Sequence, residues 1–119
     1  METYPQVHQS DKSLSVVFAQ STTYSVGRHI EIILDFCQYG RVLGVEILNL
    51  NFKAGKNSLG MISHSVQTEG DGLRYAYDDD SDSFYLQLEK GRSIDQKALH
   101  GNLFLDDLGQ IICLKAEWQ

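Results

Sequence analysis

Hydrophobic and polar side chains alternate with a period of two along most of the chain. In one such segment, Glu31 and Asp35 take the opposite face from Ile30, Ile32 and Leu34. Side chains two positions apart on a strand face the same way, so this pattern predicts half-buried β-strands. No segment has a clear helical period, and only Ser93–His100 is compatible with one or two helical turns. The alternation covers residues 14–18, 30–36, 43–47, 73–77, 84–88, 103–105 and 112–118.

Turn signals separate the alternating segments. Glycine-containing stretches at Tyr39–Arg41, Glu69–Gly72 and Asp106–Gly109 supply the positive φ angles and the local polar contacts that tight turns need. The stretch Asn49–Gly60 is different, because it is rich in Asn, Gly and Lys and has little apolar content. It is typical of a connector between two halves.

The two sides of this connector resemble each other. Residues His29–Asp35 followed by Gly40–Leu48 align with His100–Asp106 followed by Gly109–Glu117, and upstream Leu14–Phe18 aligns with Phe84–Leu88. A unit of about fifty residues cannot cover its own apolar sheet face, whereas two packed units can. We therefore predict a mostly β chain, all-β or β-rich α+β, of two pseudo-symmetric antiparallel meanders packed into one small domain. Residues 1–50 are the first repeat, 51–61 the connector and 62–119 the second repeat.

Short motifs in both halves resemble a known family. The segments Tyr77–Leu88 (YDDDSDSFYLQL), Leu103–Ile112 (LFLDDLGQII) and Gly44–Leu48 (GVEIL) are similar to the YuzE-like family of bacterial domains of unknown function. The resemblance implies two degenerate tandem copies of that fold, and it implies no established activity. Members of the family often look like small partners encoded beside toxin-like proteins, which implies an antitoxin-type role by analogy.

Charge and composition exclude several functional classes. The 119 residues carry a formal net charge of −6, with single Lys and Arg residues scattered along the chain. This balance disfavours direct binding to nucleic acid and to anionic membrane surfaces. No apolar run approaches the roughly 18 residues of a membrane span, and the N-terminus lacks the features of a signal peptide, so we expect a cytoplasmic protein. Cys37 and Cys113 are expected to be buried thiols, with a disulfide or a nucleophile left as alternatives.

One acidic stretch has the spacing of a cation site. Asp78, Asp80, Asp82 and Glu89 fall at positions one, three, five and twelve of a calcium-binding loop, where alternate carboxylates can surround a hard cation. Two features count against this interpretation. Ser83 stands where the loop needs glycine, and the flanking segments are predicted strands rather than helices. The competing interpretation is an acidic hairpin turn whose aspartates cap backbone amides.

Two histidines have equivalent positions in the aligned repeats. His29 and His100 could form a ligand or metal site between the halves, with Asp35 or Asp106 nearby. Within one strand, the Asp six residues on lies about 20 Å away, so any pairing must cross strands. The competing interpretation is a pair of partly exposed histidines at the strand starts.

The sequence therefore leaves three functional hypotheses. The first is a non-catalytic protein-interaction module: either a homodimer through an exposed strand edge, or an antitoxin-like partner of a basic protein. The second is a small-ligand or metal-binding protein with its site between the repeats. The third is an enzyme, for which no nucleophile elbow or phosphate-binding loop is present in the sequence. We assign no catalytic residue and expect no cofactor.

Overall fold

The fold of the chain is taken from a computed structural model, which describes residues 4–20, 26–55, 57–66 and 73–119. Strands dominate, as the period-two alternation predicts, and two short helices lie between the two sets of strands. The elements in chain order are β1 (Gln6–Ser10), β2 (Ser13–Val17), β3 (Val26–Phe36), β4 (Val42–Leu48), α1 (Leu50–Ala54), α2 (Gly60–Ser65), β5 (Arg74–Asp78), β6 (Ser83–Gln87), β7 (Asp95–Leu105) and β8 (Ile111–Glu117).

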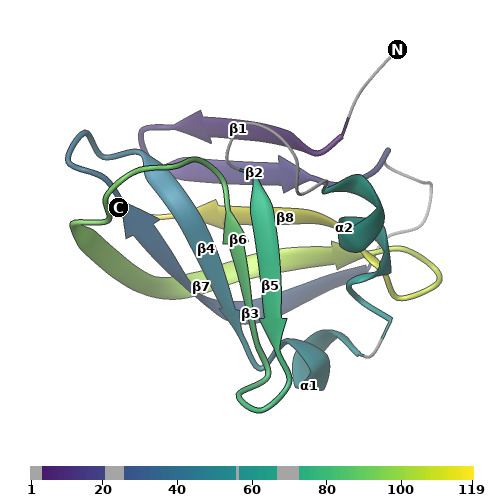
Figure 1. Ribbon diagram of the computed structural model, residues 1–119. Coiled ribbons are helices and arrows are strands. Elements are labelled where there is room, and N and C mark those ends of the chain that lie inside the picture. The colour runs from purple at the N-terminus through teal and green to yellow at the C-terminus, as the bar shows by residue number, and fades with distance from the viewer. Residues whose placement is uncertain (1–3, 21–25, 56, 67–72) are drawn as a thin grey trace.

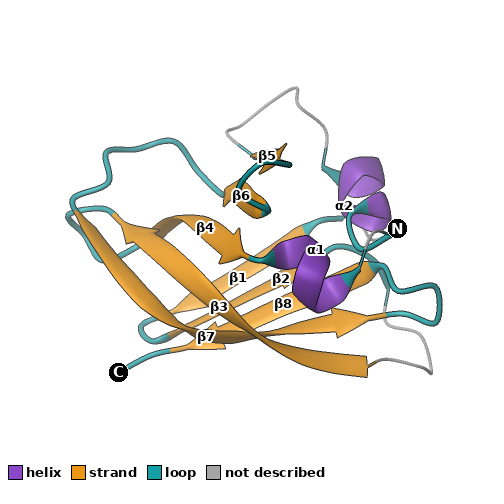
Figure 2. Ribbon diagram, turned by 90° about the horizontal axis from the view of Figure 1, so that it is seen from below, coloured by secondary structure: helices purple, strands orange, loops and turns teal. Residues whose placement is uncertain are grey.

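All eight strands form one antiparallel sheet in the order β1-β2-β8-β7-β3-β4-β6-β5. The sheet curls back on itself, so that β5 and β6 face β2 and β8 across the interior (Figures 1 and 2). The long central strands β3 and β7 pair along their whole lengths, from Val26 opposite Leu105 to Phe36 opposite Asp95. Among the described residues, no helix has the length and apolar character needed to cross a membrane.

The core fills the inside of the curl. Both halves contribute fully buried side chains, for example Leu14 and Val16 from β2, and Phe84 and Leu86 from β6. These residues come from the predicted alternating segments, and their outward neighbours are only partly buried. Burial of this apolar surface, at roughly 25 cal/mol per Å², is the main stabilising term of the fold.

The sheet has an internal two-fold pseudo-symmetry. Replacing β1–β4 by β5–β8, and the reverse, reproduces the strand order from the opposite edge. Each half supplies strands of five, five, eleven and seven residues. The halves are interlaced, because β2 pairs with β8 and β4 pairs with β6. The predicted mostly β fold of two pseudo-symmetric halves in one small domain is therefore confirmed.

The register of the repeat differs from the sequence alignment by two residues in β3 and β7. Gly40 and Gly109 both have φ of 79° in turns with the same hydrogen bonds, so equivalent residues here are 69 apart. The irregularities in strand pairing, at Asp35/Phe36 and at Phe104/Leu105, are also 69 residues apart. His29 and His100 are 71 apart, so they are not equivalent. A shift of two residues keeps every side chain on its face, and hydrophobic periodicity cannot detect it.

One further expectation changes with the structure, and the connector gains detail. Residues 95–100 of the predicted helical turn lie in β7, because they pair with β3, a contact that local sequence does not encode. Residues 51–61, predicted as a connector, hold most of α1 and the start of α2. These helices are anchored to the core by Leu50 and Ile62, whose side chains are buried.

Candidate functional site

The two predicted histidines meet where the halves join. Glu31 of β3 lies directly opposite His100 of β7, and His29 lies two residues from Glu31 on the same face. With Asn49 and Lys53, they line a cavity of about 580 Å³, which we call the seam groove. The His100 Nε2 atom is 4.0 Å from Glu31 Oε1, and both side chains are mostly exposed. The site is therefore open to solvent, and its imidazoles and ammonium group suit a polar or anionic ligand.

The aspartates expected near these histidines have other roles. Asp106 accepts hydrogen bonds from the backbone amides of Leu108 and Gln110, both at 2.9 Å, and so stabilises its own turn. Asp35 is buried on the outer face of β3 and binds Tyr85. The carboxylate that crosses strands to His100 belongs to Glu31. The sequence alignment of the repeats misses it, although the offset of 69 residues makes Glu31 the equivalent of His100.

The acidic turn between β5 and β6 caps a helix. The Asp82 carboxylate accepts hydrogen bonds from the amides of Asn51 at 2.8 Å and Phe52 at 3.1 Å, at the start of α1. The Tyr77 hydroxyl donates to it at 2.6 Å, and this bond lowers the pKa of Asp82 and raises the pKa of Tyr77 to about 12. The interpretation of an aspartate that caps backbone amides therefore fits Asp82.

The other members of the predicted cation loop do not join Asp82. Asp78 accepts a hydrogen bond from the amide of Asp80 at 3.0 Å, and Glu89 binds Arg41 at the far end of β6. In the ranges that the structure describes, no group of three or more His, Cys, Asp or Glu side chains is placed to hold a metal ion.

A polar network closes the outer face of β6, β4, β3 and β7; we call it the closed face. Asp35 accepts hydrogen bonds from Tyr85 Oη at 3.0 Å, Gln96 Nε2 at 2.6 Å and Ser93 Oγ at 3.5 Å. The Tyr85 side chain crosses Gly44, where a Cβ atom would overlap its hydroxyl group. Burial, and to a smaller extent the hydrogen bond to Asp35, raises the pKa of Tyr85 to about 12. The phenol is therefore a fixed neutral donor at physiological pH.

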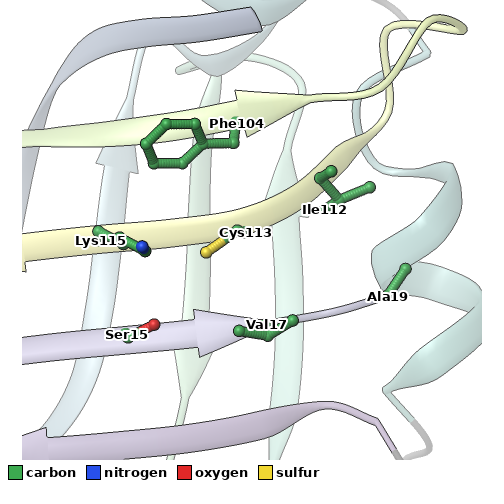
Figure 3. Close-up of a pocket in the computed structure, with 7 residues that line it drawn as sticks. All are labelled: Ser15, Val17, Ala19, Phe104, Ile112, Cys113 and Lys115. Atoms are coloured by element: carbon green, nitrogen blue, oxygen red, sulfur yellow. The ribbon is translucent and has the colours of Figure 1, made fainter. Parts of the chain in front are cut away.

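The surface related to the closed face by the pseudo-symmetry is open. Outward side chains of β2, β8 and β7 leave a cavity of about 330 Å³, which we call the open groove (Figure 3). Cys113 lies in its middle as a free, half-buried thiol, and burial raises the pKa of that thiol. Lys115 Nζ lies 5.6 Å from the centre of the Phe104 ring. The groove is lined by Ser15, Val17, Ala19, Phe104, Ile112, Cys113 and Lys115.

A third cavity, of about 480 Å³, gathers cations that are distant in sequence; we call it the basic groove. Arg41 lines it together with Lys90 and Arg92, which belong to the strap between β6 and β7. The Arg41 guanidinium binds both Glu89 carboxylate oxygens at 2.9 Å, which lowers the pKa of Glu89 and raises that of Arg41. Within the described residues, Lys90 and Arg92 make no ion pair.

The strap that carries these cations is fixed at both ends. The Leu88 amide donates to the Leu43 carbonyl at 2.8 Å, and the Ile94 amide donates to the Phe36 carbonyl at 2.9 Å. Between them, Gly91 passes so close to Leu43 that a Cβ atom would lie 2.9 Å from its side chain. Tyr39 and Ile94, at the rim of the basic groove, are 82% and 58% exposed. The scattered charges provide no signal for this surface, because only the fold brings position 41 to positions 90–92.

Comparisons with protein-family models, with curated proteins and with solved structures find no match. The functional interpretation rests on the three grooves and on the chemistry of their side chains.

Proposed function

We propose that this chain is a non-catalytic binding module that recognises a protein partner through the basic groove. The observation that carries the proposal is the exposure of two large apolar side chains, Tyr39 and Ile94, at the rim of a groove lined by Arg41, Lys90 and Arg92. Tyrosine and arginine are enriched at the centres of protein interfaces, where an apolar body and polar donors act together. The anchored strap supports a preformed surface.

The chemistry of the groove indicates the partner. Lys90 and Arg92 are exposed and without an ion pair in the described part of the chain, so they favour an acidic segment that also presents an apolar side chain. This differs from the basic partner that the overall charge of −6 suggests. The charge of the local surface determines the charge of the partner segment, because salt screens charges that lie more than about 10 Å away.

A non-catalytic role is supported by the states of the groups that could react. The Cys113 thiol has a raised pKa, and so does the Tyr85 phenol, so both are neutral at physiological pH. A nucleophilic thiol needs the opposite shift.

The pseudo-symmetry provides a matched control for a partner-capture experiment. Tyr39 and Leu108 are equivalent residues at the tips of the β3–β4 and β7–β8 turns, and both are exposed. The wild-type protein and the Leu108→Ala variant should capture the same stoichiometric partner from the native cell. The double variant Tyr39→Ala/Arg92→Glu should lose it. Equal capture by all three proteins, or none by the wild type, would contradict the proposal. Light scattering on the purified chain checks whether a second copy, paired through the edge strand β1 or β5, is the partner instead.

The seam groove favours a second function, the binding of a small anion between the halves. His29, His100 and Lys53 line one cavity there, together with the amide side chain of Asn49 and with the Glu31 carboxylate beside His100. Inorganic phosphate is a suitable probe, followed by the NMR signals of the imidazole rings. Saturable shifts of both rings should occur in the wild type and disappear in Lys53→Ala. Shifts that grow linearly with phosphate and are unchanged in that variant would exclude the site.

A further inference from the structure

The two halves offer an internal comparison at the open groove. On the closed face, the aromatic side chain of Tyr85 lies over Gly44 and reaches Asp35 with its hydroxyl group. The strand registers show which residues of the open groove correspond to these three. Ser15 corresponds to Tyr85. Cys113 corresponds to Gly44, and Phe104 corresponds to Asp35. The ring that covers the closed face therefore has no counterpart here, because the small Ser15 side chain stands in its place. Cys113 carries the Cβ atom that Gly44 lacks, and Ser15 and Cys113 line the open groove instead.

The walls of the open groove suit an aromatic group. Val17 and Phe104 flank Cys113 on neighbouring strands, and their outward side chains give an apolar lining (Figure 3). The volume of about 330 Å³ lies at the lower end of the range for small-molecule sites. A ring there can meet the Phe104 ring edge-to-face or offset, the arrangements that aromatic pairs prefer.

The charge at the groove differs from that of the closed face. Glu46 is the neighbour of Tyr85 on the closed face, whereas Lys115 is the neighbour of Ser15 in the open groove. Lys115 lies against the Phe104 ring and makes no ion pair within the described residues. An ammonium group beside an apolar recess is complementary to a ligand that carries an anionic group next to its ring.

We propose that the open groove binds a small aromatic carboxylate, with its ring above Cys113 and against Phe104, and its carboxylate paired with Lys115. This inference goes beyond the proposed function and does not depend on it, because the open groove and the basic groove share no lining residue. The site combines an apolar body with one polar contact, the usual composition of a small-ligand pocket.

Phenylacetate is the probe for this site, followed by backbone amide NMR with acetate as the matched control. Phenylacetate should give saturable shifts centred on Ser15, Cys113 and Phe104, and acetate should not. Lys115→Met should weaken phenylacetate binding roughly two- to fivefold, as expected for a solvent-exposed ion pair. Equal shifts with acetate, or no saturable shift with phenylacetate, would overturn the proposal.

A variant that rebuilds the closed face tests the geometry. Ser15→Tyr/Cys113→Gly places a tyrosine over a glycine, as on the closed face, and should abolish phenylacetate binding because the new ring fills the groove. Retained binding by the folded variant would overturn the proposal.

Alkylation of the wild-type protein gives a measurement that does not depend on folding of the variant. Phenylacetate should slow alkylation of Cys113 and leave that of Cys37 unchanged, since Cys37 lies outside the open groove. Equal rates at Cys113 with and without phenylacetate would contradict the inference.

Discussion

The closed face and the open groove are the same place in two copies of one architecture. Inside the curl the copies agree, since Leu14 and Phe84 are equivalent and both fully buried. Outside they differ, because Tyr85 and Asp35 of the closed face are replaced by Ser15 and Phe104 in the open groove. The shared core limits substitutions on the inner faces, since changes of volume there are costly. The outer faces are free of this constraint, and there the copies have taken up different chemistry.

The largest effect is expected from Asp35→Ala, which removes the acceptor of the closed face. The Tyr85 hydroxyl and the Gln96 amide would be left without this partner in a partly buried site, so the free energy of unfolding should fall by about 2–3 kcal/mol. Chemical denaturation measures the change. Glu31→Ala, on the same face of β3 but mostly exposed, is the control and should change stability by less than about 0.5 kcal/mol. Equal losses would show that the closed face has no special role.

Gly44→Ala comes next, because it brings a methyl group into the path of Tyr85. The side chain must shift away from Asp35, at a cost of about 1–3 kcal/mol of unfolding free energy. Cys113→Ala changes the equivalent position of the open half and should cost less than about 1 kcal/mol, since its surroundings already accommodate a larger side chain. If thermal denaturation gives the reverse order, the assignment of a filled and a vacant face is wrong.

A pH titration of stability sharpens the comparison, because the closed face carries a partly buried phenol, Tyr85, where the open groove has Ser15. The folded state raises the pKa of Tyr85 from about 10 to about 12, so it holds the proton more tightly than the unfolded state. Its contribution is complete below about pH 10 and is lost as the pH rises through about 12. Tyr85→Phe should therefore flatten the fall in unfolding free energy between these values. Tyr77→Phe is the parallel control, because the pKa of Tyr77 is also about 12. An unchanged slope in both variants would contradict the assigned pKa values.

The smallest effect is expected from Glu89→Gln, which breaks the ion pair with Arg41 in the basic groove. The pair is partly exposed, so the loss should be less than about 0.5 kcal/mol and should shrink further at high salt. Because the pKa of Glu89 is lowered in the folded state, this contribution disappears as the pH falls through that pKa. A loss that persists at high salt would indicate a structural role for the pair beyond its charge.

The sequence predicted the parts of the fold that depend on local pattern. Strand periodicity identified at least part of every strand from β2 to β8, and the presence of a repeat, but it missed β1. The turns at Tyr39–Arg41 and Asp106–Gly109 were also identified, whereas Glu69–Gly72 lies outside the described residues. The sequence alignment paired His29 with His100, whereas its structural equivalent is Ala98. The error was not detectable from the pattern, because a shift of two residues leaves each side chain on the same face of the sheet. The sequence also did not predict that Asp82 caps α1 or that Arg41 and Arg92 line one groove. Each of these arrangements joins segments at least thirty residues apart. His100 was identified as a site residue, but its carboxylate neighbour Glu31 follows only from the pairing of β3 with β7.

The interlacing of the halves has a consequence for how the molecule can be divided. The first hairpin of each half pairs with the last strand of the other, so neither half can complete its hydrogen-bonded ladders alone. Two polypeptides produced by cutting the chain between the repeats should each recruit the missing strands from the other and restore the whole sheet. Such a pair would serve as a two-fragment reporter, in which regained structure signals that the tethered proteins have met.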